Sequence, residues 1–218
     1  YQLHWPDRPM SLFGGSINYQ HVEGDANSIE SILGALSELI KIGKIRNIGL
    51  SNETPWGTME FIHQSKDKDL PKMQSIQNAY NLLNRIFEFG GSEIAFRESV
   101  GLLAYSPLAQ GYLTGKYQNG NLPKGSRKEL FDRLQRYEGV GSEEAIESYL
   151  NIAKKYNVDP SQLANQFVTT RPFVTSNIIG ATSMEQLKLA VTSIEVNLTE
   201  EIENDIEKAF QKHGNVAS

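Results

Sequence analysis

Hydrophobic residues recur along this chain at two different spacings, and each spacing predicts a different kind of element. Between Ile29 and Ile40 they return every three or four residues, which is typical of an amphipathic helix, and Ser28 and Gly43 supply start and stop signals. Shorter apolar runs with polar or glycine boundaries predict strands. We therefore expect strands within residues 1–6, 45–51, 73–78, 101–106 and 176–179, and helices over residues 29–40, 54–65, 88–99, 142–156, 160–170, 183–193 and 199–212.

The predicted strands and helices alternate, and this alternation requires a parallel sheet because parallel neighbours need a crossover connection. Five strands fit an open doubly wound sheet, whereas a closed α/β barrel needs eight, and periodicity alone does not decide between the two architectures. The chain opens on the strand-like segment Tyr1-Gln2-Leu3-His4-Trp5-Pro6, without a Met or a polar lead-in. Since chain termini usually lie in exposed polar segments, we expect the ordinary N-terminus to precede this sequence.

Composition narrows the function classes. The 218 residues suffice for one sizeable core and are few for two domains. The net charge of −5 argues against a nucleic-acid partner, because phosphate binding needs a basic surface. Without cysteine, the sequence excludes disulfides, thiolate metal sites and a cysteine nucleophile. Polar and charged residues interrupt the apolar runs, and no His, Asp and Glu cluster has metal-ligand spacing, so we expect neither a membrane partner nor a metal.

Neutral polar and aromatic residues follow the predicted strands, at the carboxyl ends where α/β folds place their working residues. Together they predict a nucleotide site with a ring at its centre and phosphates at its edge. Neither GxGxxG nor GxxxxGKS/T is present, so a Rossmann or P-loop binding mode is not supported. The residues concerned are Ser51, Asn52 and Gln77, which suit a carboxamide, Tyr105 for ring stacking, residues 180–183 before a helix for a phosphate, and Lys116 and Arg127 for its charge.

Five longer segments stand out: YQLHWPD at residues 1–7, GKIRNIGLSN at 43–52, IQNAYNLLNR at 76–85, LLAYSPLAQGYLTGKY at 102–117 and IIGATSMEQL at 178–187. They resemble the aldo-keto reductase family, and are most similar to the branch of the bacterial Tas protein and the potassium-channel β subunits. One such segment would be weak support, whereas five in the family's order, extending along almost the whole sequence, are specific.

The resemblance implies a TIM-type (β/α)8 barrel that binds NADP(H) and reduces aldehydes and ketones to alcohols. The five predicted strands match the family's fourth to eighth, so residues 1–218 would form one domain that is incomplete at its N-terminus. In the family's catalytic tetrad of Asp, Tyr, Lys and His, His4 matches the histidine, which orients the carbonyl oxygen. The other three belong to the first three βα units, which are absent. We therefore expect this chain alone to be a weak or inactive reductase, because it lacks the general acid.

The resemblance also implies cofactor contacts residue by residue. The family often has Glu-Asn, which contact adenine, where this chain has Leu189 and Ala190, so the preference for NADPH over NADH is open. Trp5 is interpreted either as core or as a wall of the substrate pocket. The implied cofactor-binding residues are Ser51, Asn52 and Gln77 for the carboxamide, Tyr105 for the nicotinamide ring, Ser106, Pro107, Leu108 and Gly111 for the pyrophosphate, Lys116 for the phosphates, Arg127 for the 2′-phosphate, and Gly180, Thr182 and Gln186 for the phosphate loop and the helix after it.

Two other functions remain open on the sequence. The chain could be a non-catalytic NADP(H)-binding regulatory or sensor subunit, as the resemblance to channel subunits allows, or an unrelated phosphate-binding barrel enzyme such as an isomerase or lyase. Asn81 and Arg85 are interpreted as residues that fix a loop rather than as ligands. We expect a small carbonyl substrate and a cytoplasmic location. Because five strands leave two sheet edges unpaired, we also expect either a longer chain or pairing between copies in a homo-oligomer.

Overall fold

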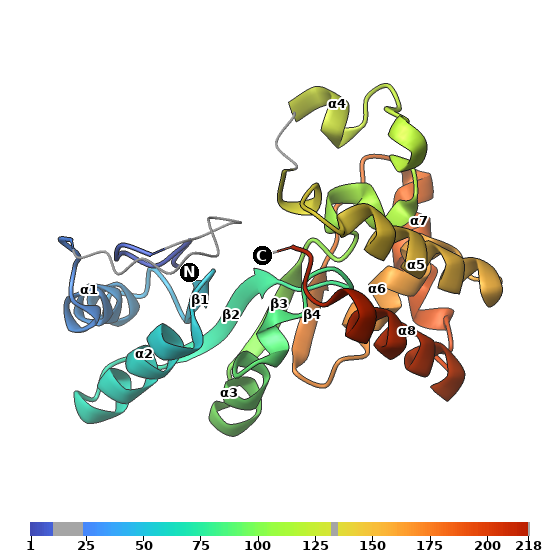
Figure 1. Cartoon of the computed structure of the whole chain (residues 1–218). Coiled ribbons are helices and arrows are strands. Elements are labelled where there is room, and N and C mark those ends of the chain that lie inside the picture. Colours follow the sequence, from blue (N-terminus) through green and yellow to red (C-terminus); the bar gives the residue numbers. More distant parts are fainter. Residues whose placement is uncertain (11–23, 132–134, 218) are drawn as a thin grey trace. The chain divides into compact units, whose positions relative to one another are not determined.

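The computed structural model describes residues 1–10, 24–131 and 135–217. Strands and helices alternate along most of the chain, as the sequence pattern predicts (Figure 1). Short 3-10 helices occupy much of the glycine-rich stretch between β3 and α5, where no element was predicted. The strands are β1 (Ile48–Ser51), β2 (Met73–Ala79), β3 (Gly101–Tyr105) and β4 (Val174–Ile178), and the α-helices are α1 (Ile29–Lys41), α2 (Pro55–Asp67), α3 (Gly91–Glu98), α4 (Arg127–Phe131), α5 (Ser142–Lys155), α6 (Pro160–Thr169), α7 (Met184–Thr192) and α8 (Glu200–His213).

The four strands form one sheet in the order β1-β2-β3-β4, which is also their order in the sequence. β1 and β2 pair in parallel, with Leu50 opposite Ile76 and Ser51 opposite Gln77. A helix connects each strand to the next, as parallel neighbours require. The predicted α/β class is therefore confirmed, and it is consistent with a TIM-type barrel.

The prediction of a first strand is wrong, because the described part of the chain contains four strands where the sequence predicted five. Residues 1–3 do run alongside β1, but they form only an isolated parallel bridge between Gln2 and Gly49. The Leu3 N–H donates to the Gly49 carbonyl oxygen at 3.0 Å, and the Gly49 N–H donates to Tyr1 at 2.9 Å. Beyond this bridge, the His4 carbonyl oxygen accepts from the Asn52 side chain.

Side-chain caps explain where several helices begin. Ser28 and Thr54 accept hydrogen bonds from the backbone N–H groups of Ser31 and Gly57, and Asp159 caps α6 in the same way. Gly43, the predicted stop after α1, has a φ of +72°, a conformation that glycine adopts without strain. No helix among the described residues has both the length and the apolar character that a membrane crossing requires.

The chain divides into two compact units. The first comprises Tyr1–Asn78 and Phe87–Leu103, and the second comprises Ala79–Ile86 and Ala104–Ser218. In the first unit α1 packs on α2 and α2 on α3, and the buried residues include Leu33, Leu50 and Ile62. In the second unit α5 packs on α8 and on α6, and α6 packs on α7 and β4. Each unit therefore has a core of its own.

Candidate functional site

The end of β1 brings four of the predicted residues together. Ser51 is buried and donates from Oγ to the Gln77 carbonyl oxygen at 2.8 Å, and the Asn52 N–H donates to the same oxygen at 3.0 Å. The Asn52 side chain donates from Nδ2 to the His4 carbonyl oxygen at 2.8 Å and to Ser51 Oγ at 3.1 Å. Asn52 has a φ of +55°, in the left-handed region that Asn tolerates. We call this network of His4, Ser51, Asn52 and Gln77 the β1 corner.

A pocket of ≈ 530 Å³ in the first unit is lined in part by the β1 corner. Its lining includes His4, Trp5 and Ser51, together with Trp56 and Phe61 of α2. The His4 and Trp5 rings stack with their centroids 4.1 Å apart and their planes at 24°. Trp5 is 52% exposed, so it is a pocket wall and not a core residue.

Sequence reasoning missed an ion pair beside the β1 corner. Arg8 donates from Nη1 to Glu53 Oε2 at 3.0 Å and from Nη2 to Glu53 Oε1 at 2.6 Å. The Arg8 guanidinium also lies 5.0 Å from the centroid of the Trp56 ring. The available signal was the presence of two opposite charges in short loops that each follow a predicted strand, but their separation of 45 residues gives no local pattern.

The segment after β3 is a turn of left-handed residues, which we call the β3 turn (residues 106–111). Ser106, Gln110 and Gly111 have φ values of +58°, +57° and +105°, and Pro107 is buried. The Gly111 N–H donates to the Leu108 carbonyl oxygen at 2.8 Å. Left-handed turns of this kind gather backbone N–H groups into concavities that bind anions, and such strain is common at ligand sites. The four residues predicted for the pyrophosphate therefore lie in a backbone that suits a phosphate.

Lys116 lies against the β3 turn. A Cβ added at Gly111 would lie 2.7 Å from Lys116 Cε and 3.0 Å from Nζ, so the lysine passes closely over the glycine. Lys116 Nζ is also 5.1 Å from the centroid of the Tyr117 ring. The lysine predicted to bind the phosphates therefore lies next to the β3 turn, which was predicted to hold the pyrophosphate.

Asn81 and Arg85 fix the loop after β2, as the sequence suggested. Asn81 is fully buried, and its Oδ1 accepts from the backbone N–H groups of Leu83 and Asn84 at 2.9 and 3.0 Å. The Arg85 guanidinium stacks 4.0 Å from the centroid of the Phe210 ring. Both side chains are held inside the second unit by these contacts, which agrees with the interpretation that they fix the loop.

Aromatic hydroxyls and charges surround the β3 turn in a way the sequence did not predict. Tyr105, partly exposed at the end of β3, accepts from Arg136 Nη1 at 3.5 Å. The Tyr112 hydroxyl donates to Glu138 Oε1, which also lies 2.6 Å from Lys128 Nζ. Burial, with the hydrogen bond to the carboxylate, raises the pKa of Tyr112 to about 12. The Lys128 ammonium lowers the pKa of the Glu138 carboxyl, and that carboxylate in turn raises the pKa of Lys128.

The remaining predicted residues are exposed on the second unit. Arg127 is exposed and is the first residue of α4. Gly180, Thr182 and Gln186 lie around the start of α7. The Thr182 N–H donates to Gln186 Oε1 at 2.9 Å, while the Gln186 N–H donates to the cap residue Ser183 at 3.2 Å. The phosphate loop predicted here is therefore a capped helix start.

The predicted site residues fall into separate groups. The β1 corner and Trp5 belong to the first unit, whereas Tyr105, the β3 turn, Lys116, Arg127 and residues 180–186 belong to the second. Within residues 1–10, 24–131 and 135–217, no group of three or more His, Asp or Glu side chains could hold a metal ion.

Comparison with known proteins finds one family and several relatives that match most of the chain. Residues 1–210 match the model of the Aldo/keto reductase family. Protein tas of Escherichia coli (strain K12) is 45% identical over 212 residues, which are 97% of this chain and 61% of tas. An aldo-keto reductase of Babesia bovis is 37% identical over 97% of this chain and 79% of its own length, and the L-glyceraldehyde 3-phosphate reductase of Escherichia coli (strain K12) is 31% identical over 87% and 56%. The chain thus spans 61% of the length of tas.

Proposed function

Because this chain belongs to the aldo/keto reductase family, we propose that it serves an oxidoreductase that reduces aldehydes and ketones to alcohols with NADPH. The observation that carries the proposal is the β1 corner, where His4, Ser51, Asn52 and Gln77 share one hydrogen-bond network. In this network, the residue expected to bind the carbonyl substrate is joined directly to residues expected to hold the nicotinamide carboxamide.

The proposal extends to the architecture. Residues 1–3 and strands β1 to β4 correspond, in this proposal, to the fourth to eighth strands of a (β/α)8 barrel, and residues 1–218 are one domain of it. The neighbouring strands follow the sequence order and are connected by helices, as a barrel of this class requires. The Asp, Tyr and Lys of the family's tetrad then belong to βα units other than those in these 218 residues.

When bound, NADPH supplies the hydride. His4 donates a hydrogen bond to the carbonyl oxygen and orients it, and Trp5 shields one side of the pocket from water. Ser51, Asn52 and Gln77 hold the carboxamide, for which their hydroxyl and amide groups have the required donors and acceptors. Tyr105 offers its ring to the nicotinamide and leaves the opposite face open.

The β3 turn and its neighbours hold the phosphates in this proposal. Gly111 combines a positive φ with the close approach of Lys116, and a Cβ there would clash with the lysine side chain. Gln110 Oε1 is buried and has no hydrogen-bond partner among the described residues, so it is available to a ligand or a water molecule. Gly180, Thr182 and Gln186 bind a phosphate at the start of α7, and Arg127 binds the 2′-phosphate.

Reduction by this chain alone is expected to be slow. The general acid of the family is the tetrad Tyr, and a positioned acid contributes about 10²–10⁴-fold to the rate. Within these 218 residues His4 is the one residue that matches the tetrad. The second candidate function is therefore a regulatory or sensor subunit, which binds the cofactor without turnover. We also propose a cytoplasmic location, where NADPH is available, and a small carbonyl substrate; any assembly is a homo-oligomer.

Titration of the purified 218-residue chain with NADPH, followed by nicotinamide fluorescence, tests the proposal. We expect saturable binding that weakens in Lys116→Ala and is unchanged in Lys124→Ala, a control lysine exposed in the same stretch. Arg127→Ala should weaken NADPH binding but not NADH binding, because only NADPH has the 2′-phosphate. If neither NADPH nor NADH binds, both proposed functions, the reductase and the sensor subunit, are refuted.

Turnover separates the two candidates. We expect this chain to reduce carbonyls about 10²–10⁴-fold more slowly than the Babesia bovis aldo-keto reductase, because general acid catalysis contributes about that factor. Full reductase activity would contradict the proposal that the general acid lies outside these 218 residues, and binding with no measurable reduction favours the sensor.

A further inference from the structure

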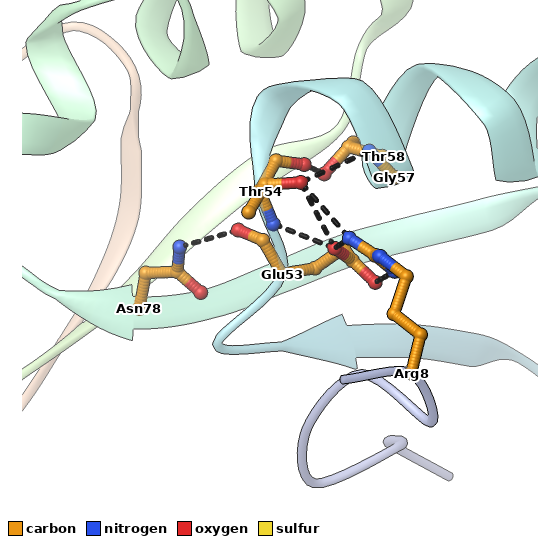
Figure 2. Close-up of polar contacts among 6 residues, drawn as sticks. All are labelled: Arg8, Glu53, Thr54, Gly57, Thr58 and Asn78. Atoms are coloured by element: carbon orange, nitrogen blue, oxygen red, sulfur yellow. Dashed lines mark hydrogen bonds and ion pairs between the residues drawn. The ribbon is translucent and has the colours of Figure 1, made fainter. Parts of the chain in front are cut away.

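Arg8 and Glu53 form an ion pair of two hydrogen bonds inside the first unit (Figure 2). The Glu53 side chain is 2% exposed and the Arg8 side chain 24%. Glu53 Oε1 also accepts from the Thr54 N–H at 2.7 Å, and Arg8 Nη2 donates to Thr54 Oγ1 at 3.0 Å. Both ions therefore have additional hydrogen bonds, which a buried ion pair needs in order to offset the loss of water.

The first turn of α2 is shaped around this pair. Thr54 caps the helix, and its Oγ1 accepts from the Gly57 N–H at 3.1 Å. A Cβ at Gly57 would overlap the Glu53 carboxylate and would lie 2.7 Å from Arg8 Nη2, so glycine is required for the close approach. The carboxylate also lies at the helix N-terminus, where negative charge is favoured. Thr54 and Gly57 thus accommodate the ion pair at the start of α2.

The pair also holds the segment that carries His4 and Trp5. The backbone hydrogen bonds between this segment and β1 end at Leu3. Side chains then hold the segment on both sides of Trp5. Asn52 binds the His4 carbonyl oxygen at 2.8 Å, and Glu53 binds the Arg8 guanidinium. Two fixed points on either side of Trp5 set the course of the backbone between them.

Glu53 is itself fixed to the sheet. Its carbonyl oxygen accepts from Asn78 Nδ2 on β2 at 3.0 Å, as Figure 2 shows. Stability alone does not account for a charged pair at this place, because apolar residues of similar volume often replace a buried ion pair without loss of stability. A pair of fixed directional bonds provides something that apolar contacts do not, which is one defined geometry.

We propose that Arg8 and Glu53 are positioning residues, which set the His4–Trp5 stack against the β1 corner and so orient the group that meets the carbonyl oxygen. The role of His4 in this inference rests on the proposed function. The position of the stack does not, because it is measurable without cofactor or substrate.

Proton NMR of the histidine ring signals in the 218-residue chain tests the inference. The Trp5 ring, 4.1 Å from His4, should give the His4 signals an upfield ring-current shift. The variant His4→Gln identifies these signals, and Trp5→Leu should remove the shift. In the double variant Arg8→Met with Glu53→Met, we expect an unfolding temperature close to that of the parent and loss of the shift. The control Glu98→Gln breaks the Lys66–Glu98 pair of the same unit, at 2.9 Å, and should leave the shift in place.

A folded double variant that keeps the His4 shift overturns the inference. If the double variant does not fold, Glu53→Gln decides instead, since it keeps the side-chain volume and removes the charge: loss of the shift supports positioning and retention of the shift overturns it. The NADPH titration of the parent chain distinguishes this inference from the proposed function. Failure of that titration removes the reductase role, whereas the NMR result still establishes what holds the His4–Trp5 stack.

Discussion

Asn81 donates from Nδ2 to the carbonyl oxygen of Ser106 at 2.9 Å, which connects the loop after β2 to the β3 turn. The same Nδ2 lies 3.1 Å from the hydroxyl of Tyr137, a residue that is 1% exposed. Ser106 has a φ of +58°, so its backbone needs support from its surroundings. One buried amide therefore stabilises the turn that we propose for the pyrophosphate.

Replacing Asn81 with Ala should destabilise the chain by about 3 kcal/mol, because it leaves several buried polar groups without their partner. The loss should appear as a lower midpoint in urea unfolding. NADPH binding should weaken as well, since the β3 turn loses its support. Asn204→Ala, at an exposed position of α8, is the control and should change stability by less than about 0.5 kcal/mol. Equal stability of the two variants would contradict the role of Asn81.

Substitutions at Asn52 should separate backbone strain from hydrogen bonding. Asn52→Ala should be less stable than Asn52→Gly by about 1 kcal/mol, because alanine is strained at a φ of +55°. Asn119, exposed and with a φ of +57°, is the matched position for the strain alone. Asn52→Gly should therefore lose about 1 kcal/mol more than Asn119→Gly, which is the value of its bonds to His4 and Ser51. Urea unfolding of the three variants measures both differences, and equal losses in the two glycine variants would count against the β1 corner.

Gly111→Ala should destabilise the chain by about 1–3 kcal/mol, because its φ of +105° is a conformation that alanine rarely adopts. Its Cβ would also displace the Lys116 side chain, so NADPH binding should weaken more than stability alone explains. Gly34→Ala is the control. Gly34 lies within α1 with no atom within 4 Å of an added Cβ, so this variant should gain about 0.5–1 kcal/mol. A neutral Gly111→Ala would show that the β3 turn does not need glycine.

Tyr112 predicts a loss of stability at alkaline pH. Its pKa is raised from 10.0 to about 12 in the folded chain, so between these values the folded state binds the proton more tightly than the unfolded state. The contribution of Tyr112 is complete below pH 10.0 and is lost as the pH rises toward about 12. Tyr112→Phe should therefore show a smaller decline of the unfolding temperature over this range than the parent. Parallel declines would contradict the raised pKa.

Glu138 predicts an effect of opposite sign at acid pH. Lys128 lowers the pKa of the Glu138 carboxyl below its ordinary value of 4.5, so the folded state favours the ionised form. Its contribution is present above pH 4.5 and is lost as the pH falls through the folded-state pKa. Glu138→Gln should be less stable than the parent at neutral pH, and thermal unfolding should show this difference shrinking in acid. The effect is modest because the side chain is 33% exposed.

Local sequence patterns predicted the elements well where the responsible forces are local. Ser28 and Thr54 cap the helices that the sequence begins there, and the starts of α5 and α6 agree with the predicted ranges. The prediction was poorer for residues 1–6, which form only an isolated bridge to Gly49, distant in sequence. It was also poorer between β3 and α5, where positive φ values and tertiary contacts, rather than periodicity, shape the chain.

The candidate site divides in the same way. Ser51 and Gln77 were grouped from the sequence, because each lies near the carboxyl end of a predicted strand, and the structure places them opposite one another. The partners of Glu53, Tyr112 and Asn81 could not be found in this way, since Arg8, Glu138 and Ser106 are distant in sequence and belong to no repeating pattern.

The sequence by itself determined the alternation of strands and helices, the helix starts and the residue types at the strand ends, because periodicity, capping and turn chemistry act between residues close along the chain. Tertiary structure alone decided that Gly57 must be small, that Glu53 is buried with Arg8, and that Asn52 holds His4. These outcomes depend on where distant segments meet and how much water is excluded there. Hydrogen-bond geometry and burial are properties of that meeting, which no local pattern encodes.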